Sequence, residues 1–550
     1  MQNIEIIYKD NKYIFPVNVT LLEISEQFKH EYKYDIIIAS VNNKITELNK
    51  TLDRDATIKF YDLTSLLGSR VYERGLVYLY IKAVKDVLKS EVIIKHSIDK
   101  GIYTQIVNDI KVTEDDINAI TDYMNKLINL SISFERLSVS RIDAINYFES
   151  INRFDKADSL KYISNTFVNL YKFDSLYDYF YGEMPINTSY LKWFSLTKVN
   201  SHGIILTFPN IYFNSQIIPY IHHEKIFLEF KRKHEWSELF KLDNMADLNK
   251  IVSQSKIKEL IYICEVEQNG RLLDIARNIN SNQDIKVVLI TGPSSSGKTT
   301  TSKKLSLYLK SMGLKPQSLS LDDYFIDRDK MIPLENGKYD FENIDAIDLD
   351  LFNEQLVKIL NKEEVLLPEF NFITGKKEYN NKRLKIDDKG ILIIEGLHAL
   401  NDEIAKNIDV KNKYKIYISP LTGINLDNHN RISTTDNRLL RRLIRDNQSR
   451  GYSASVTLAR WQDVRIGEEK YVFPYQDKAD IVFNTSLLYE FGILRLYAEP
   501  LLFSIDEEDP YYGEAIRLLN ILKNTLPIMG DDIPLDSIIR EFIGNSFFRE

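Results

Sequence analysis

The chain has 550 residues, 44% of them hydrophobic, which is enough for three or four domains with ordinary cores. Its 71 basic and 79 acidic residues leave a net charge of −8, which excludes a global attraction to nucleic acid or anionic lipid. The single cysteine, Cys264, excludes an intramolecular disulfide and a thiolate metal site, and it indicates a reducing compartment. Because the sequence has neither a signal-peptide pattern at its start nor a run long enough to span a membrane, we expect a soluble, cytoplasmic protein.

Residues 1–62 are predicted to form a small β-rich domain. Residues 4–8 and 12–15 form two strands across a turn signal, and residues 21–28 form a short helix capped by Thr20. Strands at residues 36–41 and 56–61 complete the sheet. This order resembles the TGS domain, the ubiquitin-like module of threonyl-tRNA synthetases and some GTPases. The resemblance leaves two roles open, a binding module and a structural appendage.

Residues 63–215 are predicted to form an α+β domain that resembles the editing domain of threonyl-tRNA synthetases. A similar position in that domain carries H-x-x-x-H, with further Cys and His ligands later. Here His96 is present, Lys100 stands at the second position, and the unit contains no cysteine. Because an ammonium is a poor metal ligand, we expect an editing-type fold without a metal site. The adjacent His222 and His223 would face opposite sides of a strand, so we assign no metal there.

The remaining chain is divided into three parts. Residues 216–284 are predicted to be a helical connector, because residues 257–267 and 272–277 have apolar spacing near i, i+3, i+4. Residues 285–490 form the next domain, and residues 491–550 form a helical tail that ends in a helix at residues 537–544.

The segment at residues 285–300, IKVVLITGPSSSGKTT, contains G-x-x-x-x-G-K-T between an apolar strand and a helix former. Its glycines let successive N–H groups point at phosphate oxygens, and the helix that opens near Lys298 adds its positive end. We expect Lys298 to reach the β- and γ-phosphates of ATP and the Thr299 hydroxyl to ligate Mg²⁺. The candidate phosphate-binding residues of this segment are Gly292, Ser294, Ser295, Ser296, Gly297, Lys298, Thr299 and Thr300.

Three further apolar runs, at residues 318–321, 391–394 and 414–418, fit parallel strands and predict a doubly wound α/β sheet. Chemistry in such sheets is placed at the carboxyl ends of the strands. Asp322 follows the first run and Glu395 follows the second. A carboxylate beside the P-loop strand can accept a hydroxyl proton or hold Mg²⁺ through water, so both acids are candidate site residues.

Residues 431–450 hold six arginines and no lysine. Arg438, Arg441, Arg442 and Arg445 fall on one arc of the predicted helix, where like charges at i, i+4 repel. A bound anion would offset that repulsion, and guanidinium groups suit phosphate. A solvated basic face and a nucleic-acid contact stay open as alternatives.

Residues 285 to about 490 resemble the uridine kinase and phosphoribulokinase group of P-loop kinases. The resemblance runs through the P-loop, the Asp-Asp-Tyr-Phe step that begins at Asp322, Glu395-Gly396, and residues 341–348, 368–370 and 436–442. The whole architecture, with TGS-like and editing-like units before the kinase, resembles bacterial fused uridine kinase-like nucleoside kinases. The fold class is therefore multidomain α/β.

The resemblance implies roles for particular residues. Asp322 would accept the proton of the 5′-hydroxyl, with Lys298 as a second catalytic residue, and Glu395 would help place Mg²⁺. A lid over the phosphates would contain Arg441 and Arg445 as catalytic residues and Arg442 as a cofactor-binding residue. Contacts to the ribose would come from Glu342 and Arg438, and Tyr324 and Phe370 would flank the base. Uridine kinases usually have Asp where Glu342 stands, and a His-Ser-Arg step where residues 374–377 read Thr-Gly-Lys-Lys.

The expected function is ATP- and Mg²⁺-dependent phosphorylation of a nucleoside 5′-hydroxyl, with uridine or cytidine as the default substrate. Two alternatives remain open. One is an RNA- or ribosome-associated regulatory NTPase, although residues 476–480, QDKAD, do not match the guanine-reading N/T-K-x-D. The other is a kinase of the same family that acts on a sugar phosphate or pantothenate. The expected partners are the nucleoside and ATP, no membrane, and nucleic acid only through the TGS-like domain.

Overall fold

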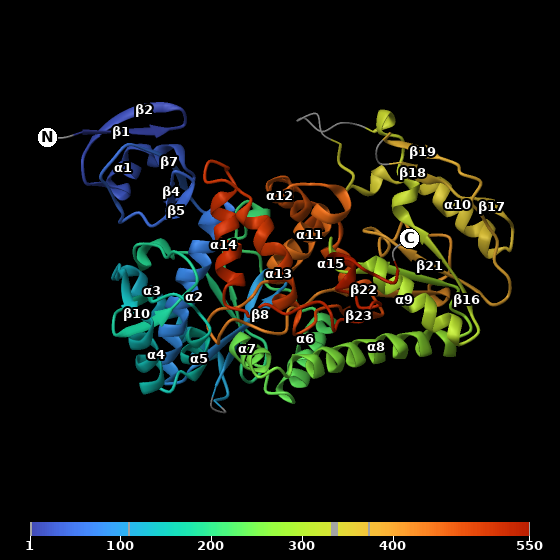
Figure 1. Cartoon of the computed structure of the whole chain (residues 1–550), viewed down its shortest axis with the longest axis horizontal. Helices are drawn as coiled ribbons and strands as arrows, with labels where there is room; N and C mark the ends of the chain where they lie inside the picture. The colour runs from blue at the N-terminus through green and yellow to red at the C-terminus, as the bar shows by residue number, and fades with distance from the viewer. Residues whose placement is uncertain (1–2, 108–109, 332–338, 372–373, 549–550) are drawn as a thin grey trace.

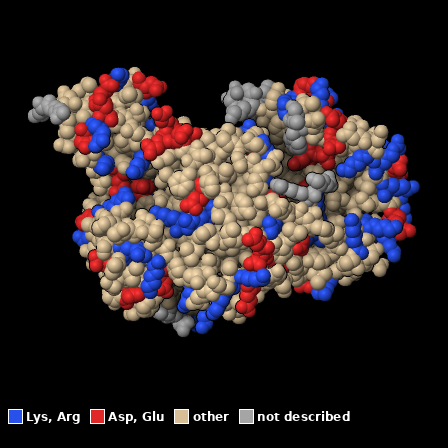
Figure 2. Space-filling view, in the orientation of Figure 1, with Lys and Arg blue, Asp and Glu red and all other residues tan. Residues whose placement is uncertain are grey.

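The computed structural model describes residues 3–107, 110–331, 339–371 and 374–548, and Figure 1 shows how their elements are arranged. No helix among these residues combines the length and the apolarity that crossing a bilayer requires. Figure 2 shows that basic and acidic side chains are interspersed on the face in view, with broad uncharged areas between them.

The first unit is a five-stranded mixed sheet with the order β2-β1-β7-β4-β5, covered by one helix. Alternate residues of β1, among them Ile4 and Ile6, pack against the buried face of α1. The α1 helix begins at the predicted cap, where the Thr20 hydroxyl accepts a hydrogen bond from the Glu23 backbone N–H at 3.2 Å. The elements are β1 (Asn3–Tyr8), β2 (Asn11–Pro16), β3 (Val19–Thr20), α1 (Leu21–Phe28), β4 (Ile38–Val41), β5 (Lys44–Thr46), β6 (Thr51–Leu52) and β7 (Ala56–Tyr61).

The second unit is built around α2 (Leu66–Leu88), a buried helix of 23 residues. A four-stranded sheet, β13-β14-β9-β8, and a three-stranded sheet, β10-β11-β12, belong to this unit. The loop between β8 and β9 carries Lys100 toward the third unit, where its Nζ lies 2.6 Å from a Glu469 carboxylate oxygen. The other elements are β8 (Val92–Ile98), β9 (Gly101–Ile106), α3 (Glu114–Asn129), β10 (Phe134–Ser140), α4 (Arg141–Ser150), α5 (Phe154–Lys161), β11 (Phe167–Phe173), β12 (Leu176–Tyr179), β13 (Ser195–Lys198) and β14 (Gly203–Thr207).

The third unit contains a five-stranded parallel sheet with the order β16-β21-β15-β22-β23, which confirms the predicted α/β class. Its central strand, β15 (Val287–Thr291), is buried along its whole length. Val288 and Ile290 belong to the apolar cluster on one face, and Val287 and Leu289 belong to the cluster on the other. The other elements are α9 (Lys298–Ser311), β16 (Lys315–Ser320), α10 (Leu349–Leu360), β17 (Val365–Leu366), β18 (Glu369–Asn371), β19 (Lys376–Glu378), β20 (Arg383–Leu384), β21 (Gly390–Glu395), β22 (Lys413–Ser419), α11 (Thr434–Arg450), α12 (Ala454–Tyr471) and β23 (Ile481–Asn484).

The segments expected as a helical connector and a helical tail pack against the parallel sheet of the third unit. Cys264 of α8 (Ile257–Ser281) and Phe491 of α13 (Glu490–Phe503) lie in the same buried cluster as Ile290. The physical reason is that a parallel sheet must be covered on both faces, and these helices cover one of them. The other helices are α6 (Glu224–Glu238), α7 (Met245–Ser253), α14 (Tyr512–Leu522) and α15 (Arg540–Ile543), the last much shorter than the helix expected at residues 537–544.

The C-terminal part of the chain returns to the N-terminal units (Figure 1). Gly513 of α14 packs against Ile45 of β5. Arg70 of α2 pairs with Glu514 of α14, the two charged atoms lying 2.5 Å apart. The three units are therefore joined by side-chain contacts as well as by the chain itself.

Candidate active site

The P-loop backbone connects β15 to α9 in a shape that requires its two glycines. A Cβ atom on Gly292 would lie 2.1 Å from the Ile418 carbonyl oxygen of β22. Gly297 has a φ of +89°, a conformation that side chains disfavour. Glycine at both positions therefore lets the loop curl tightly at the carboxyl end of β15.

The donors of this loop fit a phosphate group. The side-chain oxygens of Ser295 and Ser296 are buried and have no hydrogen-bond partner among the described residues. The Lys298 ammonium donates to the carbonyl oxygens of Gly292 and Pro293, at 2.9 and 3.3 Å. A flexible ammonium, two unsatisfied hydroxyls and the start of α9 are the groups that a P-loop offers to phosphate oxygens.

Two acids lie at neighbouring strand ends beside the loop. Glu395 ends β21 and accepts a hydrogen bond from the Thr299 hydroxyl at 3.1 Å, so two hard oxygen ligands suited to Mg²⁺ are adjacent. Burial raises the pKa of Glu395 to about 7, and the Lys298 charge opposes that rise. Asp322 follows β16 and is exposed at the surface, yet the surrounding protein removes water from its carboxyl and raises its pKa, again against Lys298.

Glu342 is a third carboxylate with a raised pKa. Burial raises its pKa to about 7, with a further rise from Glu468 and an opposing effect from Arg442. Its Cβ lies close to α12, because a Cβ on Gly467 would be 2.8 Å away. Asp322 and Lys298 also influence this group, which places Glu342 within electrostatic reach of the P-loop.

The arginines of α11 do not share one environment. Arg442 reaches the P-loop, where its Nη1 donates to the Ser294 hydroxyl at 2.8 Å. Arg445 lies beside Asp446, with 3.2 Å between the charged atoms. Asp446 also lies within 3.3 Å of Arg442 and Arg450, so an internal carboxylate offsets part of the repulsion along this helix.

Arg438 and Arg441 correct the sequence-based expectation of direct substrate and phosphate contacts. Arg438 is 1% exposed, and its two Nη atoms each lie 2.6 Å from a Glu468 oxygen. Arg441 is fully buried, pairs with Glu490 and donates to the Thr485 carbonyl oxygen at 2.9 Å. Both arginines instead support the P-loop through a neighbour.

Two of those neighbours touch the P-loop itself. A Glu468 oxygen accepts the backbone N–H of Ser294 at 2.8 Å, and the Thr485 hydroxyl donates to the Ser296 carbonyl oxygen at 2.6 Å. Glu468 lies on α12 and Thr485 follows β23, far from the loop in sequence. Sequence reasoning missed both, because neither carries a local motif.

The aromatic residues expected to flank a base lie in the core, which corrects that expectation. Tyr324 is 1% exposed, its hydroxyl donates to Gln355 at 2.9 Å, and its ring meets Phe352 edge-on at 5.0 Å. Phe370 is 4% exposed and contacts the rings of Phe325 and Phe341. In the sequence, an aromatic residue at these positions is compatible with a place in the core or in a pocket. The packing in the structure places both rings in the core.

The editing-like unit uses its two notable residues for contacts with other units. The His96 ring stacks on Phe230 of α6, with 3.6 Å between ring centres and 3° between planes. Burial lowers the pKa of His96 to about 3, so its imidazole is neutral. With Lys100 paired to Glu469, both residues bind this unit to later parts of the chain.

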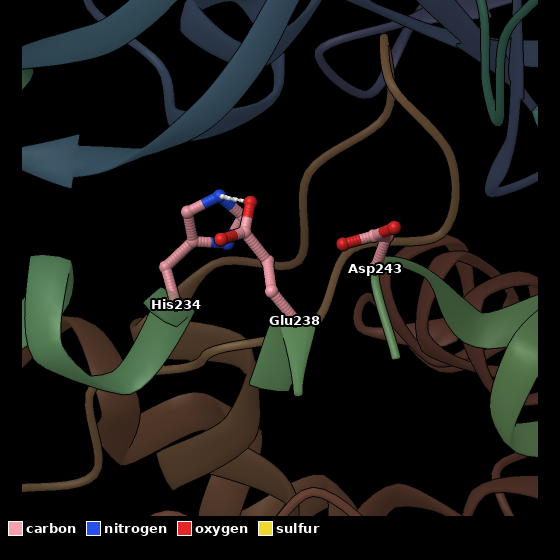
Figure 3. A group of neighbouring side chains, drawn as sticks. All are labelled: His234, Glu238 and Asp243. Carbon is pink, nitrogen blue, oxygen red and sulfur yellow. Dashed lines mark ion pairs between the residues drawn. The ribbon is translucent and has the colours of Figure 1, made fainter. Parts of the chain in front are cut away.

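Among the described residues, one group could offer a metal ion at least three His, Asp or Glu ligands, and it lies outside the site above. It comprises His234, Glu238 and Asp243, with ligand atoms within 4.8 Å of one another (Figure 3). The Lys95 ammonium lies 2.9 Å from His234 Nε2. Because a cation would have to displace that ammonium, we assign no metal to this group.

Comparison with known proteins connects this site to a family. Residues 287–487 match the model of the "Phosphoribulokinase / Uridine kinase family". A uridine kinase of Chlamydia pneumoniae is 26% identical over 198 residues, which cover 36% of this chain and 80% of that protein. A uridine kinase of Borrelia duttonii is 28% identical over 207 residues, covering 36% of this chain and 85% of that protein.

The N-terminal region has a different similarity. The threonine--tRNA ligase of Carboxydothermus hydrogenoformans is 25% identical over 187 residues, or 34% of this chain. The match covers 30% of that ligase, so the chain spans less than a third of its length. The chain thus fuses a kinase-family segment to a region similar to part of a tRNA ligase.

Proposed function

We propose that this chain is a P-loop kinase that phosphorylates the 5′-hydroxyl of a nucleoside with ATP, because residues 287–487 match the model of the phosphoribulokinase / uridine kinase family. Uridine is the substrate that the names of these relatives give, and uridine or cytidine is the substrate that we propose here. The observation that carries the proposal is the position of Asp322 beside the P-loop, where its carboxyl is influenced by Lys298. A base at that position can serve an attacking hydroxyl.

The proposed reaction transfers one phosphoryl group. The 5′-hydroxyl oxygen attacks the γ-phosphorus, the bond from that phosphorus to the bridging oxygen breaks, and ADP leaves. Asp322 takes the hydroxyl proton, which its raised pKa favours. Lys298 neutralises charge that develops on the phosphates, and Arg442 holds the loop through Ser294.

Thr299 and Glu395 would hold magnesium, since they present adjacent oxygen atoms. When bound, the ion would neutralise charge on the β- and γ-phosphates. The end of β21 fixes the position of the Glu395 carboxylate, and the start of α9 fixes that of the Thr299 hydroxyl. Glu342, beside α12, is the proposed ribose contact.

The N-terminal units are proposed to be a TGS-like domain at residues 1–62 and an editing-like domain without a metal site at residues 63–215. Their similarity to a threonine--tRNA ligase supports this division. An RNA-associated regulatory NTPase would be favoured by a continuous basic surface. The face in Figure 2 instead has charges of both signs interspersed.

An ADP-release assay across nucleosides, ribulose 5-phosphate and pantothenate tests the proposal. We expect release with uridine or cytidine, and a loss of about 10²-fold or more in Lys298→Ala. Lys310→Ala is the matched control, because Lys310 lies exposed on the same helix. Release with ribulose 5-phosphate or pantothenate alone would reject the nucleoside substrate while keeping the kinase.

A further inference from the structure

A cavity lies outside the phosphoryl-transfer site, between the second and third units of the chain. Its volume is about 310 Å³, at the small end of the range for small-molecule sites. It is lined by residues of α2, the β8–β9 loop, α12 and α14, and of the segment that leads into α11. Its basic lining residues are Arg70, Arg74, Lys100, Arg431, Arg465 and Arg517.

Basic side chains outnumber acidic ones in this lining, and Glu514 and Glu468 behind it pair with Arg70, Arg517 and Arg465. Among the described residues, the acids that line the cavity are Glu73, Asp99, Asp436 and Glu469, four against six basic groups. Arg74 donates to the Glu183 carbonyl oxygen and has no carboxylate within ion-pair distance in the described chain. The cavity also includes Ser433 and Thr435, at the start of the 17-residue helix α11, whose N-terminal dipole adds to the positive potential.

Several donors in this lining have no acceptor. Arg431 uses Nη2 to bind Glu73 at 2.6 Å, but its Nε and Nη1 are buried without a hydrogen-bond partner among the described residues. The same holds for Nε of Arg465, whose side chain is 10% exposed, and for the hydroxyl of Tyr181. Each unsatisfied buried donor costs roughly 1–3 kcal/mol. An anion with several oxygens is the kind of ligand that such donors bind.

We propose that this interdomain cavity binds the phosphate of a small phosphorylated molecule, and that nucleoside phosphates fit it best. Guanidinium groups present paired N–H donors that match phosphate oxygens. The rings of Phe208 and Tyr212 also line the cavity and offer an apolar surface for a base. Inorganic phosphate shares the anion chemistry but would add no contact to the Phe208 ring, which packs on the core, or to the Tyr212 ring, which lies 5.3 Å from the Arg465 guanidinium.

A ligand bound in this cavity would affect the P-loop through one intermediate side chain, Glu468. Arg465 binds Glu468 at 2.9 Å, and Glu468 accepts the Ser294 N–H at 2.8 Å. Lys100 and Arg465 share Glu469, at 2.6 and 2.7 Å. A phosphate that draws Arg465 toward the cavity weakens its hold on Glu468, so we expect the site to change the KM for ATP.

Calorimetric titration of the full chain with UMP, UTP and inorganic phosphate tests this site without requiring turnover. Lys298→Ala weakens the P-loop site, and we expect it to retain one equivalent of UMP or UTP. Adding Arg431→Gln should weaken that remaining binding at least roughly tenfold, because a charge-assisted hydrogen bond is lost. Arg460→Gln removes the same charge from an exposed position of α12 and serves as the control.

The titrations distinguish a nucleoside phosphate from free phosphate as the ligand of the cavity. Tighter binding of UMP than of phosphate supports a nucleoside phosphate, and equal binding supports free phosphate as the ligand of the same cavity. Melting curves check that each variant folds, and Arg431→Lys, which keeps the charge, should lose less affinity than Arg431→Gln. Identical binding by Lys298→Ala with and without Arg431→Gln, or no binding of any probe by Lys298→Ala, would overturn the proposal.

Discussion

The carboxylate of Glu541 accepts two hydrogen bonds from Thr300, one from its backbone N–H at 3.2 Å and one from its hydroxyl at 2.7 Å. Thr300 lies in the first turn of α9, where the helix N-terminus attracts anions. The same C-terminal segment contacts the loop at Gly297, where an added Cβ would lie 2.7 Å from Ile538. A carboxylate of the C-terminal segment therefore lies at the start of α9, where we propose that the phosphates of ATP bind.

Glu541→Gln should tighten ATP binding. A negative charge about 4 Å from a phosphate costs roughly 1 kcal/mol even in water, so we expect an affinity gain of at least roughly fivefold. Glu508→Gln, at an exposed position of the same tail, should leave the affinity unchanged. Equilibrium binding of ATP measures both. Weaker binding in Glu541→Gln would mean that the carboxylate supports the loop rather than opposing phosphate.

Glu468→Gln should destabilise the fold strongly. The change removes the carboxylate that pairs with buried Arg438 and Arg465, and breaking a buried ion pair costs roughly 3–5 kcal/mol. Glu235→Gln removes an exposed partner of Lys231 and should cost less than about 1 kcal/mol. Urea unfolding measures the free energy of unfolding in each variant. Equal losses would show that Glu468 is not a structural anchor of the P-loop.

Asp322→Asn should keep ATP affinity and lower kcat by about 10²–10⁴-fold, because an amide cannot accept the hydroxyl proton. In the wild type, kcat/KM for the nucleoside should rise with pH until the raised pKa of Asp322 is passed. Asp323→Asn changes the adjacent acid and should have a much smaller effect. Steady-state kinetics with separate ATP-binding measurements distinguish the roles, since a collapse of ATP affinity in Asp322→Asn would assign this acid to metal binding.

Glu342→Gln should change the pH dependence of stability. Burial raises the pKa of Glu342 from 4.5 to about 7, so the folded protein holds this proton more tightly than the unfolded chain. The resulting stability is complete below pH 4.5 and is lost as pH rises through 7. Relative to the wild type, Glu342→Gln should therefore gain stability between pH 5 and pH 8. Its Tm measured across that range, beside exposed Glu354→Gln as the control, checks the sign.

The sequence was sufficient to predict the features that depend on local pattern. The apolar run before Gly292 predicted β15, and the placement of Asp322 and Glu395 after strands predicted that they lie beside the P-loop. The strand pairings place Ser320 opposite Glu395, which brings the ends of β16 and β21 together. Capping chemistry predicted where α1 begins.

Features that depend on distant partners were not predictable. The arc of arginines on α11 was expected to meet a bound anion, but Arg438 and Arg441 meet Glu468 and Glu490, 30 and 49 residues away in sequence. Glu541 reaches the P-loop across 241 residues. An acid within a helix or a tail carries no signal of the group that it will contact, so only the folded chain reveals these pairs.

The most direct test of the central claim identifies the product itself. The wild-type protein is incubated with ATP, Mg²⁺ and uridine, and phosphorus NMR with proton coupling locates the new phosphate ester. We expect a nucleoside 5′-monophosphate that forms together with ADP and is nearly absent with Asp322→Asn. A phosphate ester at the 2′ or 3′ position, or ADP formed with no phosphorylated nucleoside from uridine, cytidine or any purine nucleoside, would contradict the account.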